Sequence, residues 1–177
     1  MTSVSPPVRD SAPAGAGGTA PRPAARTLLA ALGRAIPSDR IVADPAVLAG
    51  LSHDEAEWAP VGTAAVAVRA RSEAEVQAVV RVAAELGVPV VPRGAGTGLS
   101  GGANAVDRCI VLDLSRMTAV LDIDAENLVC VVQPGIVNND LKAVLAEQGL
   151  WYPRIRPARR GRRSAATPPP TRAACAA

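Results

Sequence analysis

Residues 64–102 read AAVAVRARSEAEVQAVVRVAAELGVPVVPRGAGTGLSGG, and this stretch decides the fold. Its first apolar run, residues 64–70, is typical of a buried strand. Ser72 to Glu75 form a capping box, which predicts the start of a helix that ends at Gly87. A second apolar run, residues 88–91, follows at once. A strand, a helix and a strand in so few residues predict a βαβ unit, normally with parallel strands.

The five glycines between Pro92 and Gly102 form the most unusual loop of the chain. The loop leaves the carboxyl end of a predicted parallel strand, where α/β sheets usually bind ligands. Glycine removes the side chain and permits positive φ, so successive N–H groups can turn toward one anion. A diphosphate is the natural candidate. The alternative is an ordinary surface loop, for which glycine and serine also suffice.

Two other phosphate motifs are excluded here. The letters from Gly96 to Gly101 match GxGxxG, but a Rossmann fingerprint must open a helix. The next apolar run, residues 109–114, predicts a strand only seven residues after Gly102 and leaves no room for that helix. A Walker loop needs a lysine after the glycines, and none follows.

Further elements are expected on both sides of this region. The pattern predicts a helix over 27–36 and a second helix from the N-cap Asp44 through Leu51. Strands 119–123 and 128–133 are expected to form a hairpin around the turn 124–127. A last helix, capped by Asn138 or Asn139, places Leu141, Val144 and Leu145 on one face and closes at Gly149.

Charge and composition separate the two ends from the rest. Residues 1–25 are rich in Pro, Ala, Gly and Ser, which predicts disorder. Residues 154–177 carry seven arginines and no acid, whereas residues 1–153 carry 12 basic and 16 acidic residues. The basic character of the protein therefore belongs to its tail. Phenylalanine is absent, so the core must be aliphatic.

Cysteine usage and hydropathy indicate a cytoplasmic protein. The three cysteines are an odd number without metal-like spacing, which favours reduced thiols and predicts no metal site. No apolar run approaches the roughly 20 residues of a membrane span, and the N-terminus lacks a signal-peptide pattern.

The sequence resembles a known family, the FAD-linked oxidases of the vanillyl-alcohol oxidase superfamily. Within this family it is similar to the FAD-binding subunit of glycolate oxidase and to flavin-dependent D-lactate dehydrogenases. The resemblance spans roughly residues 40–153. Its motifs are the glycine loop from Pro92 to Gly102, Asp113 to Met117, Val132 to Gly135 and Gly149 to Pro153.

The resemblance implies an α+β fold, an incomplete PCMH-type FAD-binding domain with a βαβ lobe and the start of a second lobe over residues 26–153. It implies FAD as cofactor and the oxidation of a small 2-hydroxy acid, such as glycolate or D-lactate, by hydride transfer to the flavin. The residues expected to bind the cofactor are Pro92, Arg93, Gly94, Ala95, Gly96, Thr97, Gly98, Leu99, Gly101 and Gly102. No catalytic residue is expected within this chain.

The tail departs from the family after Pro153. A shift of the reading frame by two bases lets residues 164–167 encode V-G-G-N and residues 168–175 encode A-A-T-N-A-G-G-L. These are the GGN and NAGG motifs that the family carries next, so we interpret residues 154–177 as a frameshifted tail without regular packing. The alternative is a genuine arginine-rich tail that binds nucleic acid or stays solvated, and nothing else in the sequence indicates a nucleic-acid partner.

Several single residues have structural interpretations. His53 is expected at a solvated helix end, and Cys109 and Cys130 are expected to be small buried residues. Asp113 and Arg116 are expected to shape a turn. Arg93 is expected to reach a phosphate, with a surface ion pair as the alternative.

Two functions remain open from the sequence. The first is an FAD-dependent oxidoreductase of which this chain is an N-terminal piece, inactive by itself. The second is a non-catalytic truncated remnant or binding module. The substrate, the electron acceptor and the oligomeric state are not encoded in these patterns.

Overall fold

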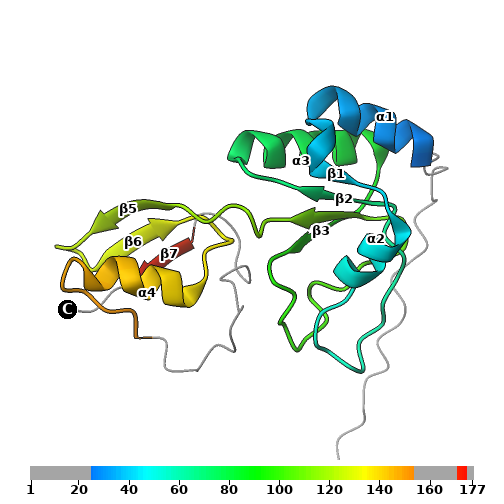
Figure 1. Ribbon diagram of the computed structural model, residues 1–177. Helices are drawn as coiled ribbons and strands as arrows, with labels where there is room; N and C mark the ends of the chain where they lie inside the picture. Colours follow the sequence, from blue (N-terminus) through cyan, green and yellow to red (C-terminus); the bar gives the residue numbers. More distant parts are fainter. Residues whose placement is uncertain (1–24, 154–170, 175–177) are drawn as a thin grey trace, which may run out of the picture.

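The computed structural model describes residues 25–153 and 171–174, and these form two sheets. The first sheet has four strands in the order β1-β2-β4-β3, and the second has three strands in the order β5-β6-β7. Figure 1 shows the two sheets side by side, each with its own helices. No helix among the described residues is long and apolar enough to cross a bilayer.

The predicted βαβ unit is present in the first sheet. Strand β2 spans Val66–Arg69, helix α3 spans Glu73–Leu86 and strand β3 spans Val90–Arg93. Strand β4, Ile110–Asp113, lies between β2 and β3 and is parallel to both. The crossover through α3 therefore skips one strand position, which β4 later fills.

Helix α3 begins and ends where the capping pattern predicts. The Ser72 hydroxyl accepts a hydrogen bond from the Glu75 N–H at 3.3 Å, and Gly87 closes the helix with φ of +62°. The Glu75 carboxylate accepts from the Arg71 N–H at 2.6 Å, one residue before the donor of an ideal capping box.

Helices cover both faces of the first sheet (Figure 1). Helix α1, Ala25–Ala35, packs with α3 on one face, where Leu32, Val79 and Ile110 are fully buried. Helix α2, Pro45–Leu51, packs on the other face. The Asp44 carboxylate caps α2 by accepting from two N–H groups, at 2.9 and 3.0 Å. Both helices were predicted from the sequence.

Two small elements precede α2 and were not predicted. They are the 3₁₀ helix η1, Ser38–Arg40, and strand β1, Ile41–Val42, which pairs antiparallel with β2. A strand of two residues is too short to show the alternation by which strands are recognised.

The second sheet starts with the predicted hairpin. Strand β5, Val120–Asp124, and strand β6, Val129–Val132, are antiparallel, and the Asn127 N–H donates to the Asp124 carboxylate at 3.0 Å in the turn. Helix α4, Asn138–Ala146, packs Leu141 and Leu145 into this lobe's core.

The predicted cap of α4 is wrong. The N-cap is Val137, which makes no side-chain capping bond, and Asn138 is already the first helical residue. The Asn138 side chain is buried in the lobe, 7% exposed, so it does not fold back over the helix end. The helix closes as expected, because Gly149 has φ of +73° and Leu150 N–H donates to Leu145 O.

The expectation that the tail lacks regular structure is wrong for four residues. Thr171–Ala174 form strand β7, which pairs antiparallel with β6. Backbone pairing at the edge of β6 requires no particular side chains, which is why composition did not predict it. Residues 1–24, 154–170 and 175–177 lie outside the described part, and so do the predictions made for them.

Candidate functional site: the glycine loop

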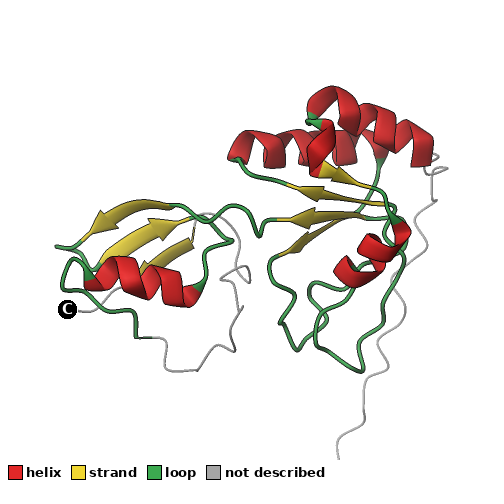
Figure 2. Ribbon diagram, in the orientation of Figure 1, coloured by secondary structure: helices red, strands yellow, loops and turns green. Residues whose placement is uncertain are grey.

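The glycine loop, residues 94–102, begins directly after β3 at the carboxyl edge of the parallel strands. It belongs to the green loops below the four-stranded sheet in Figure 2. The loop returns to the sheet through residues 103–109 and enters β4. The parallel strand pairs therefore place the loop at the edge where ligands of α/β sheets bind, as predicted.

Two of the loop glycines are required by backbone geometry. Gly96 has φ of +70° and Gly101 has φ of +74°, a region that L side chains rarely adopt. A Cβ on Gly96 would collide with the Arg93 guanidinium, and one on Gly101 would lie 2.5 Å from the Ala59 Cβ. A Cβ on Gly102 would meet nothing within 4 Å. The face of the loop at Gly102 is therefore open.

The backbone N–H groups of the loop find no acceptor among residues 25–153. Within the described part of the chain, none of the backbone N–H groups from Gly94 to Gly102 donates a hydrogen bond, although the carbonyls of Gly98 and Gly101 accept from Glu55 and Asn104. Gly98 to Ser100 and Gly102 are exposed. Nine consecutive N–H groups thus have no acceptor in the described part of the chain, and four of them belong to exposed residues.

Arg93 lies under the loop and bonds to the protein itself. Its guanidinium donates to His53 O at 2.5 Å and lies 3.5 Å from Gly50 O, and the residue is 8% exposed. Burial lowers the pKa of Arg93, and the nearby carboxylates of Asp113 and Asp54 act in the opposite direction. In this structure Arg93 ties the end of α2 to the sheet, and its expected contact to a phosphate stays a prediction.

A row of charged side chains crosses the carboxyl edge of the sheet. Asp113 on β4 is in register with Arg69 on β2 and with Arg93 on β3. The Asp113 carboxylate is 3.7 Å from Arg69 Nε and accepts from the Ser115 N–H at 2.9 Å. The predicted turn at Asp113 is confirmed. The partnership with Arg69 was missed because strand register cannot be read from local spacing.

Residues 52–62 pack against the glycine loop, and sequence reasoning also missed this contact. His53 is exposed just after α2, as expected for a solvated helix end. Its neighbour Asp54 accepts from the N–H groups of Ala56 and Ala103, at 2.9 and 3.4 Å. Asn104, 7% exposed, bonds back to the same segment. In the sequence, the only signal for this contact is the presence of a polar residue, Asn104, between two alanines directly after the loop.

Cys109 and Cys130 are fully buried free thiols, as predicted. Burial is the main cause that raises the pKa of the Cys109 thiol. Neither sulfur lies in the glycine loop.

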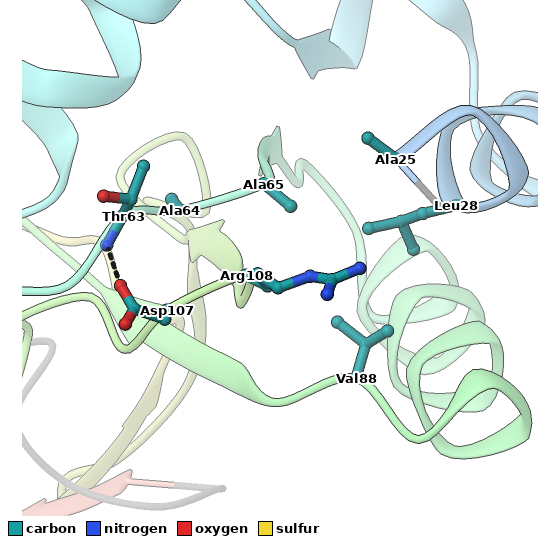
Figure 3. A pocket seen from close by; sticks show the side chains of 8 residues that line it. All are labelled: Ala25, Leu28, Thr63, Ala64, Ala65, Val88, Asp107 and Arg108. Carbon is teal, nitrogen blue, oxygen red and sulfur yellow. Dashed lines mark hydrogen bonds between the residues drawn. The ribbon is translucent and has the colours of Figure 1, made fainter. Parts of the chain in front are cut away.

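A separate pocket of about 390 Å³ lies at the opposite, amino-terminal ends of the strands (Figure 3). Its walls are mostly apolar, with Leu28 and Val88 beside the side chain of Arg108 (Figure 3). The Asp107 carboxylate in its wall accepts from the Thr63 N–H at 2.8 Å. Because the glycine loop leaves the other ends of the strands, this pocket is not the anion site.

Comparison with known proteins shows the family of the region that contains this loop. Residues 64–159 match the family described as FAD binding domain. The chain is 37% identical over 114 residues to a D-lactate dehydrogenase of Anaerostipes hadrus, with 64% of this chain and 24% of that protein covered. It is 39% identical over 83 residues to the glycolate oxidase subunit GlcD of Bacillus subtilis, covering 47% of this chain and 18% of the relative.

Among solved structures, p-cresol methylhydroxylase with substrate bound is similar in fold. The TM-score is 0.61 at 20% sequence identity, with 70% of this chain and 25% of that chain covered. This similarity confirms the predicted PCMH-type α+β fold. The chain spans about a quarter or less of the length of these three proteins.

Proposed function

Because this chain belongs to the FAD binding domain family, whose cofactor is FAD, we propose that its glycine loop holds the FAD diphosphate. The observation that carries the proposal is the run of nine loop N–H groups without an acceptor in the described part of the chain. Backbone N–H groups that converge on one point bind phosphate oxygens well. The open face at Gly102 leaves room for the ligand.

The residues present fit a diphosphate in two further respects. Positive φ at Gly96 and at Gly101 reverses the local chain direction at two points of the loop, and such residues occur in loops whose N–H groups bind anions. The predicted site residues Pro92 to Leu99, Gly101 and Gly102 all lie in or directly before this loop. We assign binding to their backbone, and to the side chain of Arg93 the support of the loop from beneath.

The proposed reaction of the complete protein is oxidation of a small 2-hydroxy acid. The support comes from the relatives, which are named D-lactate dehydrogenase and glycolate oxidase subunit. When bound, FAD supplies the hydride acceptor for such an oxidation. This chain's part is to hold the cofactor through the glycine loop, and the cysteine usage supports a cytoplasmic location.

The second candidate function is a non-catalytic binding module. It is favoured by the departure of residues 154–177 from the family's motifs. We propose that this tail is read in a displaced frame. Sequencing the DNA across codons 150–180 tests this: a clean in-frame read would contradict the frameshift and favour the module.

The test of the diphosphate site uses Gly102→Val in the 177-residue chain. The added side chain meets no protein atom within 4 Å of its Cβ, so the fold should persist, but it occupies the open face of the loop. We expect FAD affinity, measured by quenching of flavin fluorescence, to fall at least about tenfold. The matched control is Gly33→Val, because Gly33 also has open space and lies on α1, far along the chain from the loop. Equal FAD affinity in G102V and the control would contradict the proposed site.

A further inference from the structure

The glycine loop and residues 103–105, which follow it directly, are joined to the segment 52–62 by hydrogen bonds between residues about 40 to 50 positions apart. The Glu55 N–H donates to Gly98 O at 2.9 Å, and the Ala105 N–H donates to Ser52 O at 2.8 Å. The Gly62 N–H donates to Ala105 O at 2.7 Å. The shape of the loop therefore depends on this second segment as well as on its own glycines.

The Asn104 side chain makes three hydrogen bonds to the segment 52–62. Its Oδ1 accepts from the Asp54 N–H at 2.7 Å, and its Nδ2 donates to Ala59 O at 3.4 Å and to Pro60 O at 3.2 Å. Its own N–H donates to Gly101 O at 3.1 Å. One 7%-exposed amide thus joins both ends of residues 54–60 to the end of the glycine loop.

Asp54, in the segment 52–62, also contacts the residues of the glycine loop and those that follow it. Its Oδ2 accepts from the Ala103 N–H at 3.4 Å and would lie 3.0 Å from a Cβ on Gly98. A carboxylate so close to an anion site opposes binding unless its charge is balanced. The Arg93 guanidinium, whose pKa Asp54 helps to hold up, supplies that balance.

On the basis of the proposed FAD diphosphate site, we propose that Asn104 is the positioning residue of the glycine loop. It holds residues 54–60 against the loop, and this fixes the direction of the N–H groups before the ligand arrives. A loop fixed in advance loses less conformational entropy on binding, so the ligand binds more tightly. Asn104 itself does not contact the diphosphate.

The test replaces Asn104 by Asp, which keeps the size and the Oδ1 acceptor for Asp54 N–H. It removes both N–H donors and places an oxygen opposite the carbonyls of Ala59 and Pro60. Buried acceptors left without a donor are costly, so the contact should open. The matched control is Asn139→Asp, the same change at an exposed position on α4. All three proteins are the 177-residue chain.

Two kinds of measurement separate positioning from general damage. The first is the dissociation constant for FAD and for inorganic pyrophosphate, which reports on the diphosphate site alone. The second is amide hydrogen exchange at Glu55, Ala56 and Ala105, with Val68 and Leu112 in the sheet as internal references. For Asn104→Asp we expect both ligands to bind at least about tenfold more weakly and the three amides to exchange at least about tenfold faster, with the sheet amides unchanged.

FAD and pyrophosphate affinities within twofold of the wild-type chain, or unchanged exchange at the three amides, would overturn the role of Asn104. If Asn104→Asp does not fold by circular dichroism, the neutral and smaller Asn104→Ser is judged by the same criteria. A wild-type chain that binds neither FAD nor pyrophosphate would instead refute the proposed function, and the role of Asn104 with it.

Discussion

At the scale of single residues, the glycine loop contains positions that look alike in sequence but differ in structure. Gly96 has positive φ and is packed against Arg93, whereas Gly98 has no such backbone constraint and lies beside Asp54. Sequence alone predicted that both are needed for FAD. In the structure, only Gly96 of these two is required by the backbone conformation of the loop.

We predict that Gly96→Val lowers the free energy of unfolding by about 2 kcal/mol, since a β-branched residue at positive φ is strained and must displace Arg93. Gly98→Val should lower the free energy of unfolding by clearly less than Gly96→Val does. Both variants should lose FAD in a frame-restored full-length protein, because the added side chains would collide with Arg93 or Asp54 and distort the loop that we propose as the diphosphate site. Urea titration and flavin absorbance per polypeptide check the two effects. Parent-like yellow colour in either variant would show that its glycine is not at the diphosphate.

A buried thiol gives a second prediction at this scale. Burial raises the folded-state pKa of Cys109, so its contribution to stability is present below the ordinary thiol value and is lost as the pH rises through the raised pKa. The unfolding free energy should therefore fall above about pH 8.5. Cys109→Ala should flatten that part of the profile, as measured by urea titration from pH 7 to 10. An identical slope in the variant would argue against the shift.

At the scale of elements, prediction from sequence succeeded where a local rule applies. Asp44, Ser72 and Gly87 mark helix ends through hydrogen bonds or φ values that depend on a few neighbouring residues. The failures have non-local causes. The Asn138 side chain is buried in the lobe and does not cap the helix. Arg69 lies beside Asp113 through strand register. The glycine loop was located from its letters, but its contact with the segment 52–62 was not, because the contacting residues are about 50 positions apart.

The helix cap at Ser72 allows a quantitative test of one such element. Ser72→Ala removes the acceptor for the Glu75 N–H and should lower the free energy of unfolding by about 1 kcal/mol. The Glu75 carboxylate remains bound to the Arg71 N–H, which limits the loss. Ser38→Ala, at an exposed position in η1, serves as the control and should change stability by less than about 0.5 kcal/mol. Thermal or urea unfolding measures both.

At the scale of the whole molecule, two sheets carry different parts of the family's motifs. The four-stranded sheet holds the glycine loop, and the second lobe holds the motif that ends at Gly135. Gly135 packs against the carbonyls of Leu114 and Met117, in the connection between the sheets. A side chain there has no space, so the family motif at this position is structural.

We predict that the 177-residue chain binds FAD weakly and that restoring the alternative reading frame strengthens binding. Most affinity for a flavin comes from burying its ring systems. The GGN and NAGG motifs are absent from residues 154–177 as they stand, and the proposed displaced frame would supply them. Equilibrium dialysis of FAD against both chains should show a dissociation constant at least tenfold higher for the present chain. A present chain saturated with tightly bound flavin would contradict this.

The nine loop N–H groups have a consequence for how binding responds to acidity. Peptide nitrogens carry no proton that is gained or lost near neutrality, so the donors themselves have no ionisation state to change. An anion site built from lysine or histidine can be switched off by alkali, whereas one built from amides cannot. The affinity of this loop for a diphosphate should therefore follow the ionisation of the ligand alone between about pH 6 and pH 8. This range lies below the pH at which the thiol of Cys109 ionises.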